Sequence, residues 1–247
     1  MELKDVKAIV TGAAGGMGFY FAQQIAAAGG QVCAGDVNEE GLKQHGAGVF
    51  TRKLDVSSSA DVGAFTKWAA ESMGGLNVVI SNAGILRDGL LVKKDKVTGE
   101  VKVMSDDQFT SVIAVNLTGA TYVVRDAVAE MVRRDSRGVV IAMSSIARHG
   151  NRGQSNYVSA KAALAANAVT WSKEFGSFGI RAVAIAPGMV ETPMTQGMNQ
   201  AARDAIVKTI PVGRIGNTED LWKGIKFAIE CEYLNGTTID IDGGAKL

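Results

Sequence analysis

Short apolar runs alternate with longer amphipathic segments along almost the whole chain. The apolar runs place hydrophobic residues at consecutive positions, which is typical of strands buried on both faces. They lie at residues 6–10, 32–35, 49–54, 76–80, 139–143, 180–186 and 237–241, and helices are predicted at 16–28, 58–73, 106–134, 156–178 and 218–230. Buried strands separated by helices pair in parallel through right-handed crossovers. The pattern therefore predicts an α/β fold with a doubly wound, seven-stranded parallel sheet and helices on both faces.

Two stretches interrupt this alternation of apolar runs and helical segments. Segment 92–104 alternates polar and apolar residues on both sides of Thr98-Gly99, which predicts a short surface hairpin. The 3 prolines all fall in the last third of the chain, so the longest irregular loop is expected between Pro187 and Pro211. No low-complexity linker divides the sequence, and we expect residues 1–247 to form one domain.

Composition narrows the range of partners. The chain has 26 basic and 25 acidic residues and a net charge of +1, which gives no reason to expect nucleic acid or an anionic membrane as a partner. The 2 cysteines, Cys33 and Cys231, form no disulfide or metal-binding pattern, so no metal is expected. We expect no signal region and no apolar run long enough to span a bilayer. A soluble cytoplasmic protein is expected.

A glycine-rich stretch, Thr-Gly-Ala-Ala-Gly-Gly-Met-Gly at residues 11–18, joins the first strand to the first helix. Glycines at 12, 16 and 18 would let the backbone turn tightly and approach a pyrophosphate, and Met17 lies at the start of the helix. The N-terminus of the helix would add free N–H groups and the positive end of its dipole. The alternative is a plain strand–helix turn, but the position in the first βαβ unit favours a dinucleotide site.

Asp36 ends the second strand, at the position where an acid can accept hydrogen bonds from the ribose hydroxyls of a dinucleotide. A carboxylate there would repel a 2′-phosphate. No Arg or Lys occurs between Thr11 and Asp36, and none directly follows Asp36. These features favour NAD(H) over NADP(H). The alternative is that Asp36 is the N-cap of a following helix.

The third and fourth strands also end in polar residues. Asp55-Val56 follows the third strand, and Asn82-Ala83-Gly84 follows the fourth. Open α/β sheets bind ligands at the carboxyl ends of strands beside the switch point, so both elements are expected to contact the cofactor. Asp55 could accept a hydrogen bond from the adenine amino group, or it could instead cap the helix that begins near Ser57.

Tyr157 and Lys161 are four residues apart within a predicted helix, which puts both side chains on one face. At about 4 Å and an effective dielectric of about 20, an ammonium would favour a phenolate by about 4 kcal/mol. That attraction would lower the pKa of Tyr157 from about 10 towards about 7, where a phenol can exchange a proton with an alcohol. Taken alone, the pair could be an ordinary surface contact.

Together these elements resemble the short-chain dehydrogenase/reductase family over the whole chain. The family has a Rossmann fold, and its motifs match Thr11-Gly12, Gly16, Gly18, Asp55-Val56, Asn82-Ala83-Gly84, Asn116, Ser144, Tyr157, Lys161, Pro187-Gly188, Thr192 and 239–244. The resemblance implies that the catalytic residues are Asn116, Ser144, Tyr157 and Lys161. It also implies that the cofactor contacts include Tyr157, Lys161, Pro187, Gly188, Val190 and Thr192. A homotetramer is implied, with helices 106–134 and 156–178 pairing across one interface.

The catalytic serine has two candidates, Ser144 and Ser145. Ser144 lies thirteen residues before Tyr157, and this spacing resembles the family. Ser145 would need a connection shorter by one residue. The spacing therefore favours Ser144.

The chain most resembles 3-oxoacyl-(acyl-carrier-protein) reductases and 3-hydroxyacyl-CoA dehydrogenases. This resemblance implies that the enzyme interconverts a 3-hydroxyacyl and a 3-oxoacyl thioester, carried on CoA or on an acyl-carrier protein. An enzyme of the same family that acts on a polyol, steroid or aromatic alcohol is an alternative. A non-catalytic NAD-binding regulator is a further one. Lysines of the predicted hairpin could meet CoA phosphates or could simply be solvated; they are Lys93, Lys94, Lys96 and Lys102.

Overall fold

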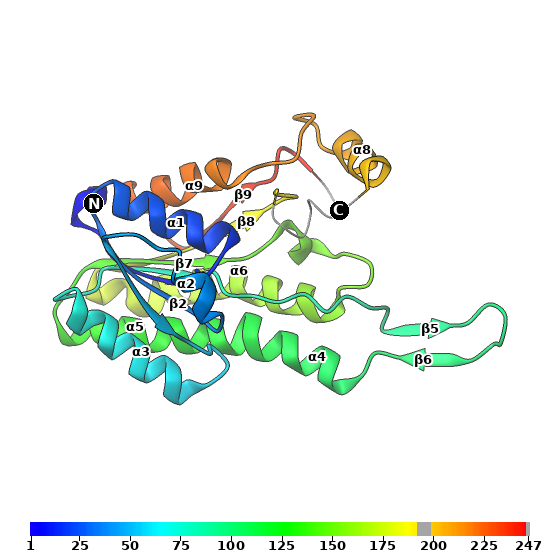
Figure 1. Cartoon of the computed structure of the whole chain (residues 1–247), viewed down its shortest axis with the longest axis horizontal. Helices are drawn as coiled ribbons and strands as arrows, with labels where there is room; N and C mark the ends of the chain where they lie inside the picture. The colour runs from blue at the N-terminus through cyan, green and yellow to red at the C-terminus, as the bar shows by residue number, and fades with distance from the viewer. Residues whose placement is uncertain (192–198, 246–247) are drawn as a thin grey trace.

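A seven-stranded parallel sheet in the order β3-β2-β1-β4-β7-β8-β9 forms the centre of the molecule (Figure 1). The computed structural model describes residues 1–191 and 199–245. The strands are β1 Lys7–Thr11, β2 Gln31–Asp36, β3 Val49–Lys53, β4 Val78–Ser81, β7 Gly138–Met143, β8 Ile180–Pro187 and β9 Thr237–Ile241. All seven predicted strands are confirmed. The strand order reverses between β1 and β4, which makes the carboxyl ends of these two strands the switch point of the sheet.

Helices cover both faces of the sheet, as predicted (Figure 1). One face carries α1 (Gly16–Ala27) and α9 (Thr218–Glu230), whose apolar side chains share one core with alternate strand residues. The other face carries α3 (Ser59–Ser72), α5 (Ala120–Arg133) and α6 (Ser155–Phe175), which share a second core. Because neighbouring strand residues point to opposite faces, consecutive apolar residues fill both cores.

The predicted helix over residues 106–134 consists of three parts. These are α4 (Asp106–Ile113), the π-helical segment η2 (Ala114–Gly119) and α5. A π-helical turn holds one residue more than an α-helical turn and is common at functional sites. The periodicity of the sequence predicted one continuous helix and did not reveal η2.

Two α-helices among the described residues were not predicted. The short helix α2 (Glu39–Leu42) follows β2, and α8 (Gln200–Thr209) lies inside the segment that was expected to be irregular. Prolines 187 and 211 mark the ends of that segment correctly. Residues 200–209 contain no glycine or proline and include three alanines, which favour helix.

The predicted hairpin is present as β5 (Val92–Lys94) paired antiparallel with β6 (Val101–Val103). It projects from the body beyond the start of α4 (Figure 1). All six strand residues are exposed, including the lysines at 93, 94 and 102.

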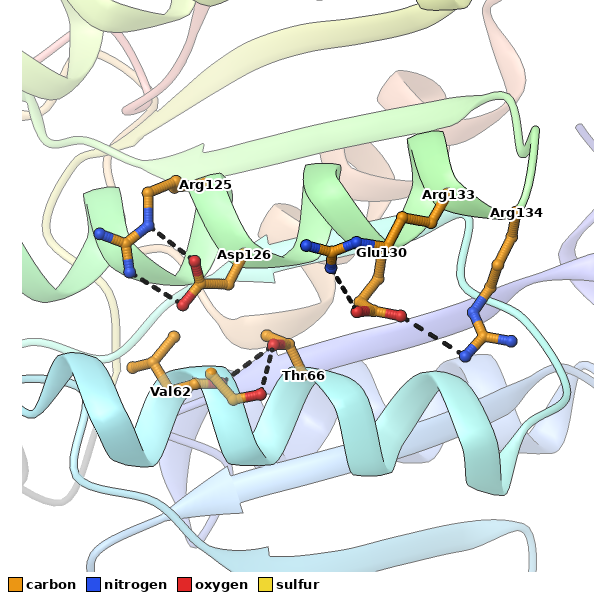
Figure 2. A network of polar contacts seen from close by, with 8 residues as sticks. Val62, Thr66, Arg125, Asp126, Glu130, Arg133 and Arg134 are labelled. Atoms are coloured by element: carbon orange, nitrogen blue, oxygen red, sulfur yellow. Dashed lines mark hydrogen bonds and ion pairs between the residues drawn. The ribbon is translucent and has the colours of Figure 1, made fainter.

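One helical stretch within the described residues, Asp106–Arg133, is long and apolar enough to cross a membrane by length and composition. This helix does not overturn the expectation that the chain has no membrane span, because a helix of a buried core meets the same criteria. The stretch packs on the sheet with α3 and α6, which explains its apolar side. The side of α5 that faces α3 also carries ion pairs, Arg125 with Asp126 and Glu130 with Arg133 and Arg134 (Figure 2).

Candidate active site

The glycine loop owes its composition to close backbone contacts. Gly12 has φ +66° and Gly16 has φ +54°, a region that side chains strain. A Cβ on Gly12 would lie 2.8 Å from the Ala83 Cα, and one on Gly18 would overlap the Gly12 carbonyl oxygen. The loop can therefore pass between β4 and α1 only with glycine at these positions.

The crest of the loop, which consists of Gly15 and Gly16, faces open space. A Cβ added to Gly15 or Gly16 would meet no described atom within 4 Å. Helix α1 starts there without a side-chain cap, so its first N–H groups point towards that space. Met17 is half-buried behind the crest and packs against the core. These features fit a pyrophosphate at the N-terminus of α1.

Asp36 ties the end of β2 to the glycine loop. Its Oδ2 accepts a hydrogen bond from the Ala14 N–H at 3.0 Å, and its Oδ1 accepts one from the Asn38 N–H at 2.9 Å. Asn38 is the N-cap of α2, because its side chain accepts from the Gly41 N–H. The alternative that Asp36 is a helix cap is wrong. Its carboxylate lies instead at the switch-point edge, where a ribose could donate to it.

Asp55 is not a helix cap either. The N-cap of α3 is Ser58, whose hydroxyl accepts from the Asp61 N–H. Asp55 Oδ1 accepts from the Ser57 N–H at 2.9 Å and from the Ser57 hydroxyl at 2.6 Å. Val56 is buried, and a Cβ on Gly119, the last residue of η2, would lie 2.8 Å from the Val56 carbonyl oxygen.

Asn82 joins the end of β4 to the glycine loop. Its Nδ2 donates to the carbonyl oxygens of Thr11 at 3.0 Å and Gly12 at 3.2 Å. In return the buried Thr11 hydroxyl accepts from the N–H groups of Asn82 and Ala83, both at 3.1 Å. Asn82 Oδ1 is buried and has no donor among the described residues. An unsatisfied buried acceptor costs about 1–3 kcal/mol, so this atom fits a donor supplied by a ligand.

Asn116 lies in the π-helical segment η2 and is wholly buried. Its side-chain amide binds the backbone of Ile85 twice, accepting from the N–H at 2.8 Å and donating to the carbonyl oxygen at 2.9 Å. A Cβ on Gly84 would lie 3.4 Å from Asn116 Oδ1 and 3.7 Å from Lys161 Nζ. Asn116 therefore holds the segment after β4 beside the lysine.

Tyr157 and Lys161 share one face of α6, as their spacing predicts. The Lys161 Nζ lies 5.5 Å from the centroid of the Tyr157 ring and donates to the Met143 carbonyl oxygen at 2.6 Å. Burial lowers the pKa of the Lys161 ammonium to about 8. The carbonyl and the ring face partly replace the water that the buried ammonium has lost.

The electrostatic environment of Tyr157 differs from the expectation. Burial raises the pKa of its phenol above 10.0, and the Asp88 carboxylate raises it further. A hydrogen bond with the Ser145 side chain acts in the opposite direction and lowers this pKa. Lys161 contacts the ring and the Met143 carbonyl oxygen, so the expected large lowering of the Tyr157 pKa by Lys161 is wrong for this arrangement.

The two adjacent serines point in different directions. Ser144 donates its hydroxyl to the Lys161 carbonyl oxygen at 2.8 Å and is buried. The Ser145 side chain lowers the pKa of the Tyr157 phenol, and its hydroxyl accepts from the Ala147 N–H at 3.1 Å. Neighbouring residues of an extended chain alternate in direction, so only one serine can face the phenol. The structure places Ser145 there, which differs from the preference for Ser144 based on spacing.

The segment after β8 borders the site on the opposite side. The Gly188 N–H donates to the Ile241 carbonyl oxygen at 3.0 Å, and a Cβ on Gly188 would lie 2.7 Å from the Asp242 Cα. Pro187 is the last residue of β8, and Val190 forms a parallel bridge with Gly216. Thr192 lies outside the described residues. No group of three or more His, Cys, Asp or Glu gathers within residues 1–191 and 199–245.

Sequence reasoning did not assign a role to Thr11 or Asn156. The buried Thr11 hydroxyl joins β1 to β4. The signal in the sequence was a polar residue at the end of an apolar run, directly before Gly12. Asn156 is buried, donates to the carbonyl oxygens of Arg87 and Gln108, and accepts from the Tyr157 N–H at 2.8 Å. It fixes the start of α6 against the segment that follows β4.

Comparison with known proteins agrees with this geometry. A family model described as enoyl-(acyl carrier protein) reductase matches residues 12–246. A 3-oxoacyl-(acyl-carrier-protein) reductase of Thermotoga maritima is 33% identical over 253 residues, covering 99% of each chain. A protein of the same name from Chlamydia muridarum is 34% identical, and an uncharacterized oxidoreductase of Mycobacterium bovis is 35% identical.

These matches cover nearly the whole chain, including the glycine loop and the Tyr157–Lys161 pair. The likeness between the chain and its relatives is therefore not confined to a shared nucleotide-binding half. The protein belongs to the short-chain dehydrogenase/reductase family and is an oxidoreductase that acts on CH–OH groups with a nicotinamide cofactor.

Proposed function

We propose that this enzyme uses NAD(H) to interconvert a secondary alcohol and a ketone, with a 3-hydroxyacyl/3-oxoacyl thioester as its substrate. The observation that carries the proposal is that residues suited to hold a cofactor and residues suited to transfer a proton lie along the same edge of the sheet. The open N-terminus of α1 and Asp36 lie at one end, and Ser145, Tyr157 and Lys161 lie at the other.

The nicotinamide supplies or accepts the hydride, and the protein handles the proton. In the reduction, Tyr157 donates its phenolic proton to the oxygen that becomes the alcohol. The same tyrosine takes the proton back in the oxidation. The raised pKa of Tyr157 keeps the phenol protonated at neutral pH, which suits a proton donor. Ser145 acts on the pKa of the phenol and would donate to the same substrate oxygen.

Lys161 and Asn116 support this proton transfer. Lys161 supplies a buried positive charge near the phenol, which stabilises the phenolate left after proton donation, and it would bind the nicotinamide ribose. Both polar atoms of the Asn116 amide are engaged by Ile85, so we assign Asn116 a positioning role at η2. Gly12, Gly16, Met17, Gly18, Asp55, Val56, Asn82, Ala83, Gly84, Pro187, Gly188, Val190 and Thr192 would surround the remaining parts of the cofactor.

The preference for NAD(H) rests on Asp36. Its carboxylate stands at the end of β2, and both its oxygens already bind N–H groups of the loop and of Asn38. Replacing a ribose hydroxyl with a phosphate would place two anions side by side at that point. We infer that NADP(H) binds much more weakly.

The proposed substrate class is based on the names of similar proteins. Two of the similar proteins are named as reductases of 3-oxoacyl groups on acyl-carrier protein. We propose the same 3-oxoacyl chemistry for this chain, with CoA or the carrier protein as the thioester partner. The alternatives are a polyol, steroid or aromatic alcohol, or a regulator that binds NAD without turnover. We also propose one catalytic domain over residues 1–247, a homotetramer and a cytoplasmic location.

A substrate panel tests the proposal. Purified enzyme is mixed with NADH or NADPH and with 3-oxoacyl-CoA, 3-oxoacyl-carrier protein, or ketones related to polyols and steroids. Loss of absorbance of the reduced cofactor measures turnover. We expect the highest kcat/KM with NADH and a 3-oxoacyl thioester. Preference for NADPH or for a ketone outside this class would contradict the proposal, and NADH binding without turnover on any ketone would favour the regulator.

A further inference from the structure

His45 belongs to none of the motifs that form the active site and lies in the turn between α2 and β3, yet it contacts the glycine loop. Its Nε2 is 2.8 Å from the Ala13 carbonyl oxygen, and its Nδ1 is 3.1 Å from Gln23 Nε2. Its ring packs on Phe19 of α1, with the ring centroids 4.5 Å apart. The side chain therefore links the loop to α1 from outside the sheet.

The partners of the imidazole define which nitrogen carries the hydrogen. A carbonyl oxygen can only accept, so Nε2 must donate to Ala13. Nδ1 of the neutral ring then has a free lone pair, which accepts from the amide of Gln23. Both ring nitrogens are satisfied by one neutral tautomer, and this arrangement needs no charge on the ring.

The backbone that His45 holds directly precedes Gly15 and Gly16, where the loop opens towards the proposed pyrophosphate. The Ala13 N–H donates to the Gly35 carbonyl oxygen at 3.3 Å, and the Ala14 N–H donates to Asp36 Oδ2 at 3.0 Å. These two bonds hold the N–H groups of residues 13 and 14. The bond to His45 holds the Ala13 carbonyl oxygen and so fixes the orientation of the Ala13–Ala14 peptide plane.

Such an anchor matters because glycines surround these two residues. Glycine loses more conformational freedom on ordering than any other residue, and Gly12, Gly15, Gly16 and Gly18 all lie within this stretch. A loop that is already held in one conformation loses less entropy when its ligand binds. Holding the Ala13–Ala14 peptide is therefore expected to raise affinity for the dinucleotide.

We propose that His45 is a positioning residue that keeps the glycine loop in its pyrophosphate-binding conformation and thereby sets the affinity for the dinucleotide. The proposal rests on the proposed function as an NAD(H)-dependent oxidoreductase. His45 acts through the Ala13 carbonyl at the β2 end of the site and touches none of Ser145, Tyr157 and Lys161. Its effect should fall on cofactor binding and leave the proton transfer unchanged.

The test compares His45→Ala with wild type by titrating NADH against the purified enzyme and by measuring kcat at saturating NADH. Loss of one hydrogen bond and of loop ordering should raise the Kd about five- to tenfold, with kcat within about twofold. His45→Gln, whose amide can donate to the same carbonyl, should recover most of the affinity. Gln23→Ala should weaken binding about two- to threefold and serves if His45→Ala does not fold.

The matched control is Lys43→Ala, because Lys43 is exposed in the same segment and pairs with Glu40. This variant should leave the Kd for NADH and the kcat unchanged. An unchanged Kd in both His45→Ala and Gln23→Ala, or a fall in kcat with an unchanged Kd, would overturn the role of His45 while leaving the proposed function intact. A wild-type enzyme that binds no NADH would refute the proposed function and this proposal with it.

Discussion

The two ends of the site are built in different ways. At the β2 end, backbone groups form most of the surface, and Asp36 and Asn82 bind main-chain atoms of the glycine loop. At the β7 end, we propose that three side chains do the chemistry, and the direction in which each serine hydroxyl points decides its role. Ser144 and Ser145 are adjacent, yet one binds the backbone of α6 and the other binds Tyr157. The first end therefore depends on the conformation of the backbone, and the second depends on the directions of individual side chains.

Tyr157→Phe would separate the two ends most sharply. The ring and its packing remain, and only the proton donor is lost, so kcat should fall by about a thousandfold or more. The Kd for NADH should stay within about twofold, because the glycine loop and Asp36 are untouched. Steady-state kinetics and an NADH titration measure both quantities. A variant that kept more than about a tenth of the wild-type rate would show that Tyr157 is not the proton donor.

A pair of serine variants tests the assignment within the β7 end. Ser145→Ala removes the hydroxyl that binds Tyr157 and should lower kcat about a hundredfold. Ser144→Ala removes a buried hydrogen bond to the Lys161 carbonyl oxygen and should cost about 1 kcal/mol of unfolding free energy, with kcat within about threefold. Kinetics and urea unfolding of both variants provide the comparison. The reverse order of the two kcat values would return the catalytic role to Ser144.

Lys161 should make stability depend on pH. Burial lowers the pKa of Lys161 from 10.5 to about 8 in the folded protein, so between these values the unfolded chain binds a proton that the folded chain does not. The free energy of unfolding should therefore rise with pH across this window, by up to about 3 kcal/mol from this residue. The Lys161→Met variant has no titrating group at this position, so its free energy of unfolding should not show this rise with pH. Urea unfolding of both proteins at pH 7.5 and 10.5 measures the difference, and parallel pH profiles would show that burial of Lys161 does not cause the dependence.

The charge of Asp36 should control the choice of cofactor at the β2 end. Asp36→Asn keeps the shape of the side chain and removes the repulsion of a 2′-phosphate. The ratio of kcat/KM for NADPH to that for NADH should rise about tenfold, since about 1.4 kcal/mol of repulsion is relieved. Asp55→Asn is the control, because Asp55 binds Ser57 and should leave the ratio unchanged. An unchanged ratio in Asp36→Asn would remove the basis for the NAD(H) assignment.

The fold could be predicted because it follows from the residue types of short segments and from their order along the chain. Seven runs of consecutive apolar residues, separated by helical segments, lead to one parallel sheet. Gly12 and Gly18 could also be found, because close backbone contacts allow no side chain there. These features depend on residue type and order, which the sequence states directly.

Other features depend on three-dimensional contacts. The directions of the Ser144 and Ser145 hydroxyls follow from how β7 meets α6, and a count of residues to Tyr157 cannot supply them. The raised pKa of Tyr157 follows from burial, which outweighs the lowering by the Ser145 side chain, while Lys161 donates to the Met143 carbonyl oxygen. The π-helical segment that contains Asn116 and the contact of Asn116 with the Ile85 backbone were also not evident from the sequence.

One measurement tests the central claim most directly, namely that both ends of the site act on one substrate. NADH carrying deuterium at both positions of nicotinamide C4 is incubated with enzyme and a 3-oxoacyl thioester, and the product is analysed by mass spectrometry. We predict one deuterium at C3 of the 3-hydroxyacyl product for wild type, and no labelled product for Tyr157→Phe although it binds NADH. A wild-type enzyme that binds NADH but transfers no deuterium to the thioester would contradict the claim.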